Sequence, residues 1–76
     1  MNLETLKKYH EIFTDCWKLF KEFNNPTDDD KFWTRLKGES RRLSQKDKSS
    51  ELRQALIKEI NLEIHRIWKR QGDKNE

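Results

Sequence analysis

Three kinds of side chain in this sequence could perform chemistry: two histidines, a single cysteine and a run of three aspartates. An acid–base or metal site needs such groups to converge, and its usual signatures are Cys/His clusters or a helical HExxH motif. His10 and His65 belong to neither pattern, and helical geometry places them in different surroundings. We therefore expect no catalytic or metal-binding role for either histidine.

The cysteine and the aspartates have simpler explanations. Cys16 falls inside an apolar helical stripe with no histidine on the neighbouring turns, which is typical of a buried structural thiol. The aspartates at 28–30 follow Thr27 at the start of a predicted helix, where the helix dipole favours anions. Gly38 and Gly72 are too far apart to form a phosphate-cradling loop. The sequence thus predicts a protein that is not an enzyme and holds no metal or cofactor.

Composition limits the size and class of the fold. The chain has 76 residues, 32% hydrophobic and 41% charged, with a net charge of only +3. This length allows one domain with a small core, which buries about 60% of the surface of the unfolded chain. The longest apolar run is residues 55–57, far too short for a membrane helix. With a single cysteine as well, we expect a cytoplasmic protein without a membrane partner.

Apolar periodicity predicts three helices, at about residues 3–24, 28–46 and 51–71. The first carries apolar residues at spacings of 3 and 4, with Ile12, Trp17 and Leu19 widening the stripe; the regular positions are Leu6, Tyr9, Phe13, Cys16, Phe20 and Phe23. The second has a narrower stripe that includes Ser40, and the third repeats isoleucine at 57, 60, 64 and 67. Each helix is therefore expected to be amphipathic.

Signals between the stripes set the expected ends of the helices. Pro26 ends the first helix, and Thr27 is expected to cap the second. Ser49 or Ser50 should cap the third, and Gly72 should end it. Residues 1–72 then form one domain, with a frayed tail at 73–76.

Short connections and the shared spacing predict an all-α, up-down-up three-helix bundle. Seven aromatic residues should gather at one end of this bundle, as core or as a partly open surface for a partner; they are Phe13, Trp17, Phe20, Phe23, Phe32, Trp33 and Trp68. A leucine-rich opposite end would contain Leu3, Leu6, Leu43, Leu52 and Leu56.

Two binding hypotheses follow from the surface pattern. The first is a small protein-interaction or adaptor module that binds another protein or a second copy of itself. Its interface would include two apolar residues opposite the core stripe of the third helix and two aromatic residues, namely Leu62, Ala55, Trp33 and Trp68. If the chain does not fold alone, it would be a helical hairpin that completes a four-helix dimer, with the first helix at the shared seam. No small-molecule substrate is evident from the sequence.

The alternative is nucleic-acid binding of low specificity. Residues 31–48 hold seven Lys or Arg and two acidic residues, so the second helix is the basic element. Such a surface could hold phosphates by counterion release. The residues expected to contact nucleic acid are Lys31, Arg35, Arg41, Arg42 and Lys48. A simpler explanation is that these charges solvate the outer face of a small domain.

Overall fold

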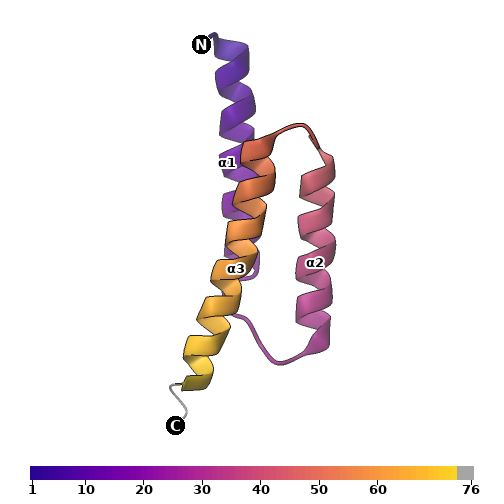
Figure 1. Ribbon diagram of the computed structural model, residues 1–76, viewed down its shortest axis with the longest axis vertical. Helices are drawn as coiled ribbons and strands as arrows, with labels where there is room; N and C mark the ends of the chain where they lie inside the picture. The colour runs from indigo at the N-terminus through magenta and orange to yellow at the C-terminus, as the bar shows by residue number, and fades with distance from the viewer. Residues whose placement is uncertain (74–76) are drawn as a thin grey trace.

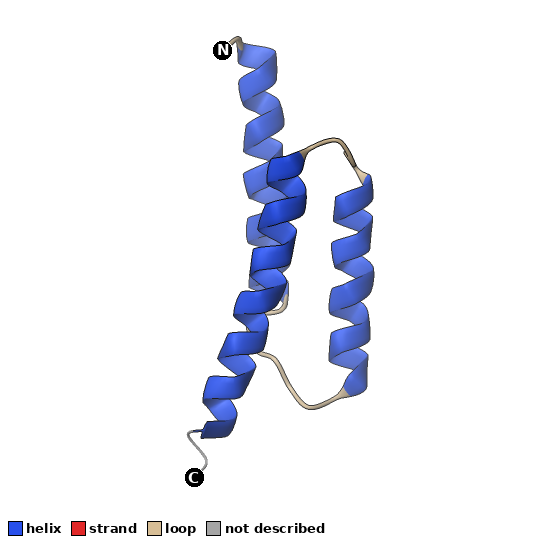
Figure 2. Ribbon diagram, viewed as in Figure 1, coloured by secondary structure: helices blue, strands red, loops and turns tan. Residues whose placement is uncertain are grey.

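The computed structural model describes residues 1–73 and contains three helices in this range: α1 (Leu3–Glu22), α2 (Asp30–Gln45) and α3 (Glu51–Asp73). All three pack against one another, so the predicted all-α three-helix bundle is confirmed. α1 and α3 run in the same direction and α2 runs against them, so the termini lie at opposite ends (Figure 1). Short loops join the helices (Figure 2). The expected tail lies mostly outside the described residues, and Asp73 itself ends α3.

Capping side chains explain where the helices begin. Asn2 Oδ1 accepts a hydrogen bond from the backbone N–H of Thr5 at 2.9 Å, which satisfies one free donor at the start of α1. The cap of α2 is Asp29, whose Oδ1 accepts from Lys31 N at 2.9 Å. The prediction that Thr27 caps this helix was therefore wrong. Thr27 Oγ1 instead accepts from Asp29 N at 3.1 Å, which adds a short turn before the helix.

Other boundary predictions had mixed outcomes. Ser50 caps α3, because its Oγ accepts from the backbone N–H of Arg53 at 3.1 Å. Gly72 does not end α3, which continues to Asp73. Gly38 lies inside an uninterrupted α2, so the irregularity that glycine could cause is absent there.

The core is a single line of buried side chains between the three helices. α1 contributes three of them and its C-cap residue Phe23 a fourth, at spacings of 4, 3 and 4, as a helix that presents one face to its neighbours should. The buried apolar residues are Ile12, Cys16, Leu19, Phe23, Leu36, Leu43, Ile57 and Ile64. Half-buried side chains pack around them, namely Phe20, Phe32, Trp33, Leu52, Leu56 and Ile60.

Four aromatic residues form a cluster, whereas Phe13 and Trp17 lie apart from it and are exposed. The rings of Phe23, Phe32, Trp33 and Trp68 follow one another at centroid distances of 5.0–5.7 Å. Trp17 lies outside this cluster, and its ring centroid is 6.4 Å from that of Phe20. Phe13 and Trp17 are 55% and 60% exposed, so the prediction that both join the aromatic end was wrong. Their positions on α1 point away from α2 and α3.

The molecule is elongated, with extents of 52 × 20 × 17 Å. The first turns of α1 extend beyond the connection between α2 and α3 (Figure 1). Leu3 and Leu6 lie on these turns and are exposed, so they do not join Leu43 in a leucine-rich end as predicted. The bundle thus leaves part of its longest apolar stripe uncovered.

Candidate functional site

One face of α1 is apolar and exposed. We call it the α1 apolar face, and it consists of Leu3, Leu6, Tyr9, Phe13 and Trp17. Leu6 is 52% exposed, close to the values for Phe13 and Trp17. At 100° per residue these five positions span about 120° of the helix surface. They therefore form one continuous strip rather than scattered apolar residues.

The sequence of α1 explains why this strip stays in solvent. The buried line that contains Ile12, Cys16, Leu19 and Phe23 is offset from the α1 apolar face by roughly 110° around the helix axis. Only the buried line faces the other two helices. Both lines keep the 3-4 spacing, so periodicity alone could not tell which one would be buried. Two neighbours are too few to cover both.

One residue of the α1 apolar face shares a surface hollow with α3. Leu52 of α3 lines the same hollow as Tyr9 and Ile12 of α1, and the other lining residues are polar or charged. Leu52 and Leu56 are half-buried and pack against the core. In this hollow the α1 apolar face therefore has one apolar neighbour from α3, Leu52.

The five basic residues predicted to bind nucleic acid are not equivalent in the structure. Arg35 Nη2 lies 3.7 Å from Glu22 Oε2 of α1, and Arg35 Cζ lies 5.4 Å from the centre of the Phe23 ring. Arg42 pairs with Glu39 on its own helix. Lys31, Arg41 and Lys48 are exposed, and within residues 1–73 none of them forms an ion pair. Two of the five predicted residues therefore pair with glutamates, Arg35 with one on α1 and Arg42 with one on α2.

The four residues predicted to form a protein interface also differ in accessibility. Leu62 is 43% exposed and Ala55 is exposed, as expected for positions opposite the core. Trp33 and Trp68 are half-buried with ring centroids 5.7 Å apart. The Trp33 Nε1–H donates to the carbonyl of Thr27 at 2.8 Å. The indoles are therefore anchored by the bundle and present only part of their surface.

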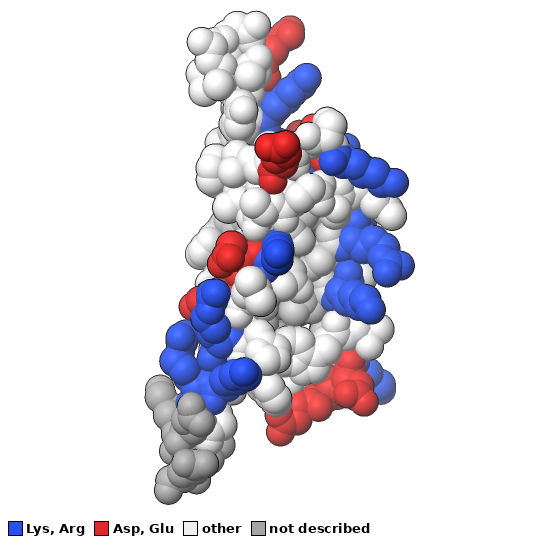
Figure 3. Space-filling model, viewed as in Figure 1, with Lys and Arg blue, Asp and Glu red and all other residues white. Residues whose placement is uncertain are grey.

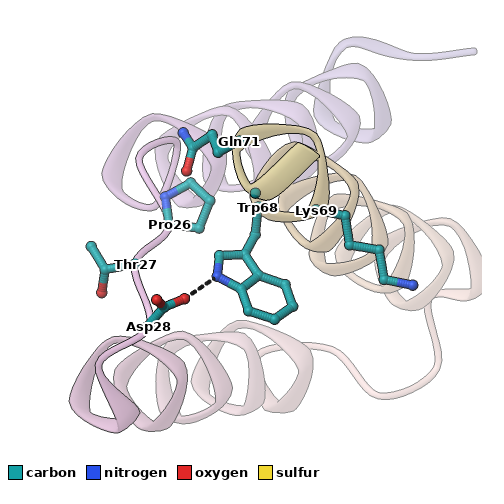
Figure 4. A pocket seen from close by; sticks show the side chains of 7 residues that line it. Pro26, Thr27, Asp28, Trp68, Lys69 and Gln71 are labelled. Atoms are coloured by element: carbon teal, nitrogen blue, oxygen red, sulfur yellow. Dashed lines mark hydrogen bonds between the residues drawn. The ribbon is translucent and has the colours of Figure 1, made fainter. Parts of the chain in front are cut away.

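A cleft lies beside Trp68, between the α1–α2 loop and the last turns of α3. It has a volume of about 570 Å³ and is lined by loop residues 26–28 and by Trp68, Lys69, Gln71 and Gly72. The Trp68 Nε1–H donates to Asp28 Oδ1 at 2.7 Å, while Lys69 points away from that carboxylate (Figure 4). This hydrogen bond joins the loop to α3, and it occupies the indole donor that a ligand in the cleft would need.

A second hollow, the α2–α3 groove, has a volume of about 380 Å³. Its lining is mainly apolar, with basic side chains at the edges; the lining residues are Trp33, Leu36, Lys37, Lys58, Asn61, Leu62 and His65. Asn61 Nδ2 donates to Ser40 Oγ at 2.9 Å and to the Ile57 carbonyl at 2.8 Å. The groove therefore joins Trp33 and Leu62, two of the predicted interface residues, with lysines that sequence reasoning did not single out.

A buried arginine is the feature that sequence reasoning missed. Arg53 of α3 donates from Nη1 to Asp15 Oδ2 of α1 at 3.0 Å and to the Leu43 carbonyl of α2 at 3.3 Å. Lys46 Nζ lies 3.0 Å from the same carboxylate oxygen of Asp15. The sequence does contain a signal for the burial of Arg53. The isoleucines of α3 are spaced by 3 and 4 residues, and position 53 lies four residues before Ile57, on the same side of the helix. This network joins all three helices and so has a structural role.

This network favours the ionised form of the Asp15 carboxylate. Partial burial raises the pKa of Asp15, but hydrogen bonds from Lys46 and Arg53 outweigh it and hold the pKa below the ordinary 3.8. Burial raises the pKa of the neighbouring Cys16 thiol above its ordinary 9.0. A buried thiol with a raised pKa is a poor nucleophile.

The histidines lie apart. His65 is exposed, with its ring 5.8 Å from Trp33 and 5.3 Å from Trp68, whereas His10 lies on the exposed surface of α1. Across residues 1–73, no group of three His, Cys, Asp or Glu residues is arranged to hold a metal ion. In the same range, no helix has the length and apolar character needed to cross a membrane.

Comparisons of this chain with models of protein families, with curated proteins and with solved structures found no match.

Proposed function

We propose that this chain is a non-enzymatic protein-interaction module that associates with a second copy of itself through the α1 apolar face. The observation that carries this proposal is the exposure of five large apolar side chains on one side of a single helix. Exposed apolar strips of this kind are typical of interaction sites, whereas single exposed apolar residues are ordinary.

The size of the α1 apolar face supports a modest but specific interface. An aromatic side chain can bury about 150–250 Å², so Phe13 and Trp17 each present roughly 100 Å². The whole strip then presents roughly 500 Å², close to the upper end for the largest patch of a monomer. Two copies would bury roughly 1,000 Å² in total, where specific interfaces begin.

The shape of the surface favours a second copy as the partner. A two-fold dimer uses the same patch on both chains, and a straight apolar strip on one helix can pack against its own copy. The five residues are spaced by 3, 3, 4 and 4 positions, which keeps them all on the side of α1 that would meet the partner helix. Three of the five residues, Tyr9, Phe13 and Trp17, are aromatic, and aromatic side chains are enriched among the residues that dominate binding energy.

Sedimentation equilibrium tests this proposal across micromolar to millimolar concentrations. We expect a monomer–dimer equilibrium in the wild-type chain, at least tenfold weaker association in Phe13→Glu and Trp17→Glu, and unchanged association in Ala55→Glu. Ala55 is an exposed apolar residue of α3 and serves as the matched control for added charge. A wild-type chain that stays monomeric at about 1 mM would contradict self-association.

Nucleic-acid binding is the second candidate. It is favoured by the exposed side chains of Lys31, Arg41 and Lys48, which form no ion pair with any described residue. Titration with random-sequence DNA and RNA at low and moderate salt tests it. Binding that falls steeply with salt and weakens in Arg41→Glu would support this function. If Arg41→Glu leaves the affinity unchanged, α2 is not the contact surface.

A further inference from the structure

We propose that the α2–α3 groove binds a short amphipathic helix of a partner protein, whose apolar side chains are flanked by aspartate or glutamate. This surface lies between α2 and α3 and is separate from the α1 apolar face. The proposal rests on two properties of the groove: its apolar floor and the single sign of charge at its rim.

The floor of the groove offers apolar contact and few free polar groups. It is formed by the half-buried Trp33, the buried Leu36 and the exposed Leu62. The N–H donors of the floor are already used, because the Trp33 Nε1–H donates to the Thr27 carbonyl and Asn61 Nδ2 donates to Ser40 Oγ and the Ile57 carbonyl. An occupant therefore gains by covering apolar surface, not by hydrogen bonding to the floor.

The rim of the groove is basic. Lys37 lies on the α2 side, Lys58 and His65 lie on the α3 side, and no acidic residue lines the groove. Within residues 1–73 neither lysine forms an ion pair. Figure 3 views the molecule from the side of α3, and basic side chains stand over α2 and over α3 with uncoloured surface between them. Carboxylates placed on both sides of an apolar segment would match this pattern.

These properties together select the occupant. A polyanion would use the rim but leave the apolar floor uncovered, and a purely apolar segment would leave the lysines without partners. A helix with leucine on one face and glutamate beside it satisfies both, which is the usual way that grooves between helices recognise amphipathic segments. The groove is open to solvent, as a peptide requires, rather than closed around a small molecule.

Fluorescence anisotropy of a labelled peptide tests the proposal on the full chain. The probe is a fluorescein-labelled helical peptide of about four turns, with leucines along one face and glutamates on the others. A second peptide with glutamine in place of glutamate measures the charge contribution. Far-UV circular dichroism of every variant checks that the bundle stays folded.

Three protein variants locate the binding surface. Lys37→Glu combined with Lys58→Glu should weaken binding at least tenfold, and Leu62→Glu should weaken it by a similar factor. The matched control combines Lys7→Glu with Lys18→Glu, which changes the net charge equally but lies on exposed positions of α1. This control should change the affinity less than twofold, and the glutamine peptide should bind at least fivefold more weakly than the glutamate peptide.

Several results would overturn the proposal. Equal weakening in both double variants would show general charge attraction, and unchanged binding in Leu62→Glu would remove the groove as the site. Displacement of the peptide by single-stranded DNA, with DNA binding unaffected by Leu62→Glu, would show a polyanion surface instead. Trp17→Glu should keep peptide binding, so failure of the groove and failure of self-association through α1 can be told apart.

Discussion

Arg53 of α3 and Asp15 of α1 form the bundle's most enclosed ion pair, with Arg53 Nη1 and Asp15 Oδ2 3.0 Å apart and Arg53 only 3% exposed. The Arg53 Nε is buried and has no hydrogen-bond partner among the described residues. Since the same guanidinium also donates to the Leu43 carbonyl, one side chain ties α3 to both other helices. The bundle thus depends on a charged residue at a position that is otherwise apolar.

Removal of Asp15 should destabilise the bundle strongly. In Asp15→Ala, Arg53 would remain buried without its carboxylate partner, and breaking one side of a buried pair costs about 3–5 kcal/mol. A bundle of this size has a net stability of about 3–5 kcal/mol, so we expect substantial unfolding at 25 °C. Urea unfolding followed by circular dichroism measures this effect. Arg42→Ala is the control: it removes an exposed pair with Glu39 and should lower stability far less than Asp15→Ala. Equal losses in the two variants would contradict a central role for Arg53.

Acid should weaken the bundle through Asp15. Its pKa in the folded chain lies below the ordinary 3.8, so the unfolded chain binds the proton more readily. The contribution of Asp15 is therefore complete above about pH 5 and is lost as the pH falls through 3.8 to the lower folded value. Urea unfolding between pH 6 and pH 2 should show a steeper loss of stability in the wild type than in a variant that combines Asp15→Asn with Arg53→Met, which leaves no buried charge without its partner. Parallel profiles would mean that other carboxylates dominate the acid response.

The two aromatic environments of α1 should respond differently to substitution. Phe23 is 1% exposed, and Phe23→Ala should lower the free energy of unfolding by about 3–5 kcal/mol. Trp17 is mostly in solvent, so Trp17→Gln should change it by less than about 1 kcal/mol. Thermal unfolding at low protein concentration, where a dimer would dissociate, makes the comparison. A large loss in Trp17→Gln under these conditions would place Trp17 in the core.

Gly38 offers a stabilising change. It lies inside α2, and a Cβ atom built there would meet nothing within 4 Å. Alanine in a helix interior is more favourable than glycine by about 0.5–1 kcal/mol, so Gly38→Ala should raise stability by that amount. Urea unfolding measures it. A lower free energy of unfolding in Gly38→Ala would contradict this expectation, because it would mean that residue 38 does not keep the regular helical backbone of α2.

The sequence was sufficient to predict the fold because each helix carries its own period and its own end signals. Pro26 and Ser50 separated the elements, and the isoleucine repeat located the buried side of α3. The periodicity of α1 was correct but ambiguous, since two adjacent lines of residues share the same spacing. Which line is buried depends on where α2 and α3 pack, and that is a tertiary property.

The surfaces were harder to predict than the helices. Lys37 and Lys58 come from different helices, and only the folded bundle brings them to opposite sides of the same α2–α3 groove. Counting charges along the chain placed Arg35, Arg41 and Arg42 in one group. In the structure Arg35 and Arg42 form ion pairs with nearby glutamates, whereas Arg41 forms none with the described residues. Sequence reasoning therefore found the basic element without finding which of its charges are free.

The central claim, that two copies meet through the α1 apolar face, is tested most directly by isotope-filtered nuclear Overhauser measurements. A mixture of labelled and unlabelled chains at about 1 mM is expected to show intermolecular contacts from the rings of Phe13 and Trp17 to protons of the same face. Trp17→Glu should remove these contacts while the intramolecular contacts of Phe23 persist. Intermolecular contacts confined to Leu62 and Trp33, or none at all, would contradict the account.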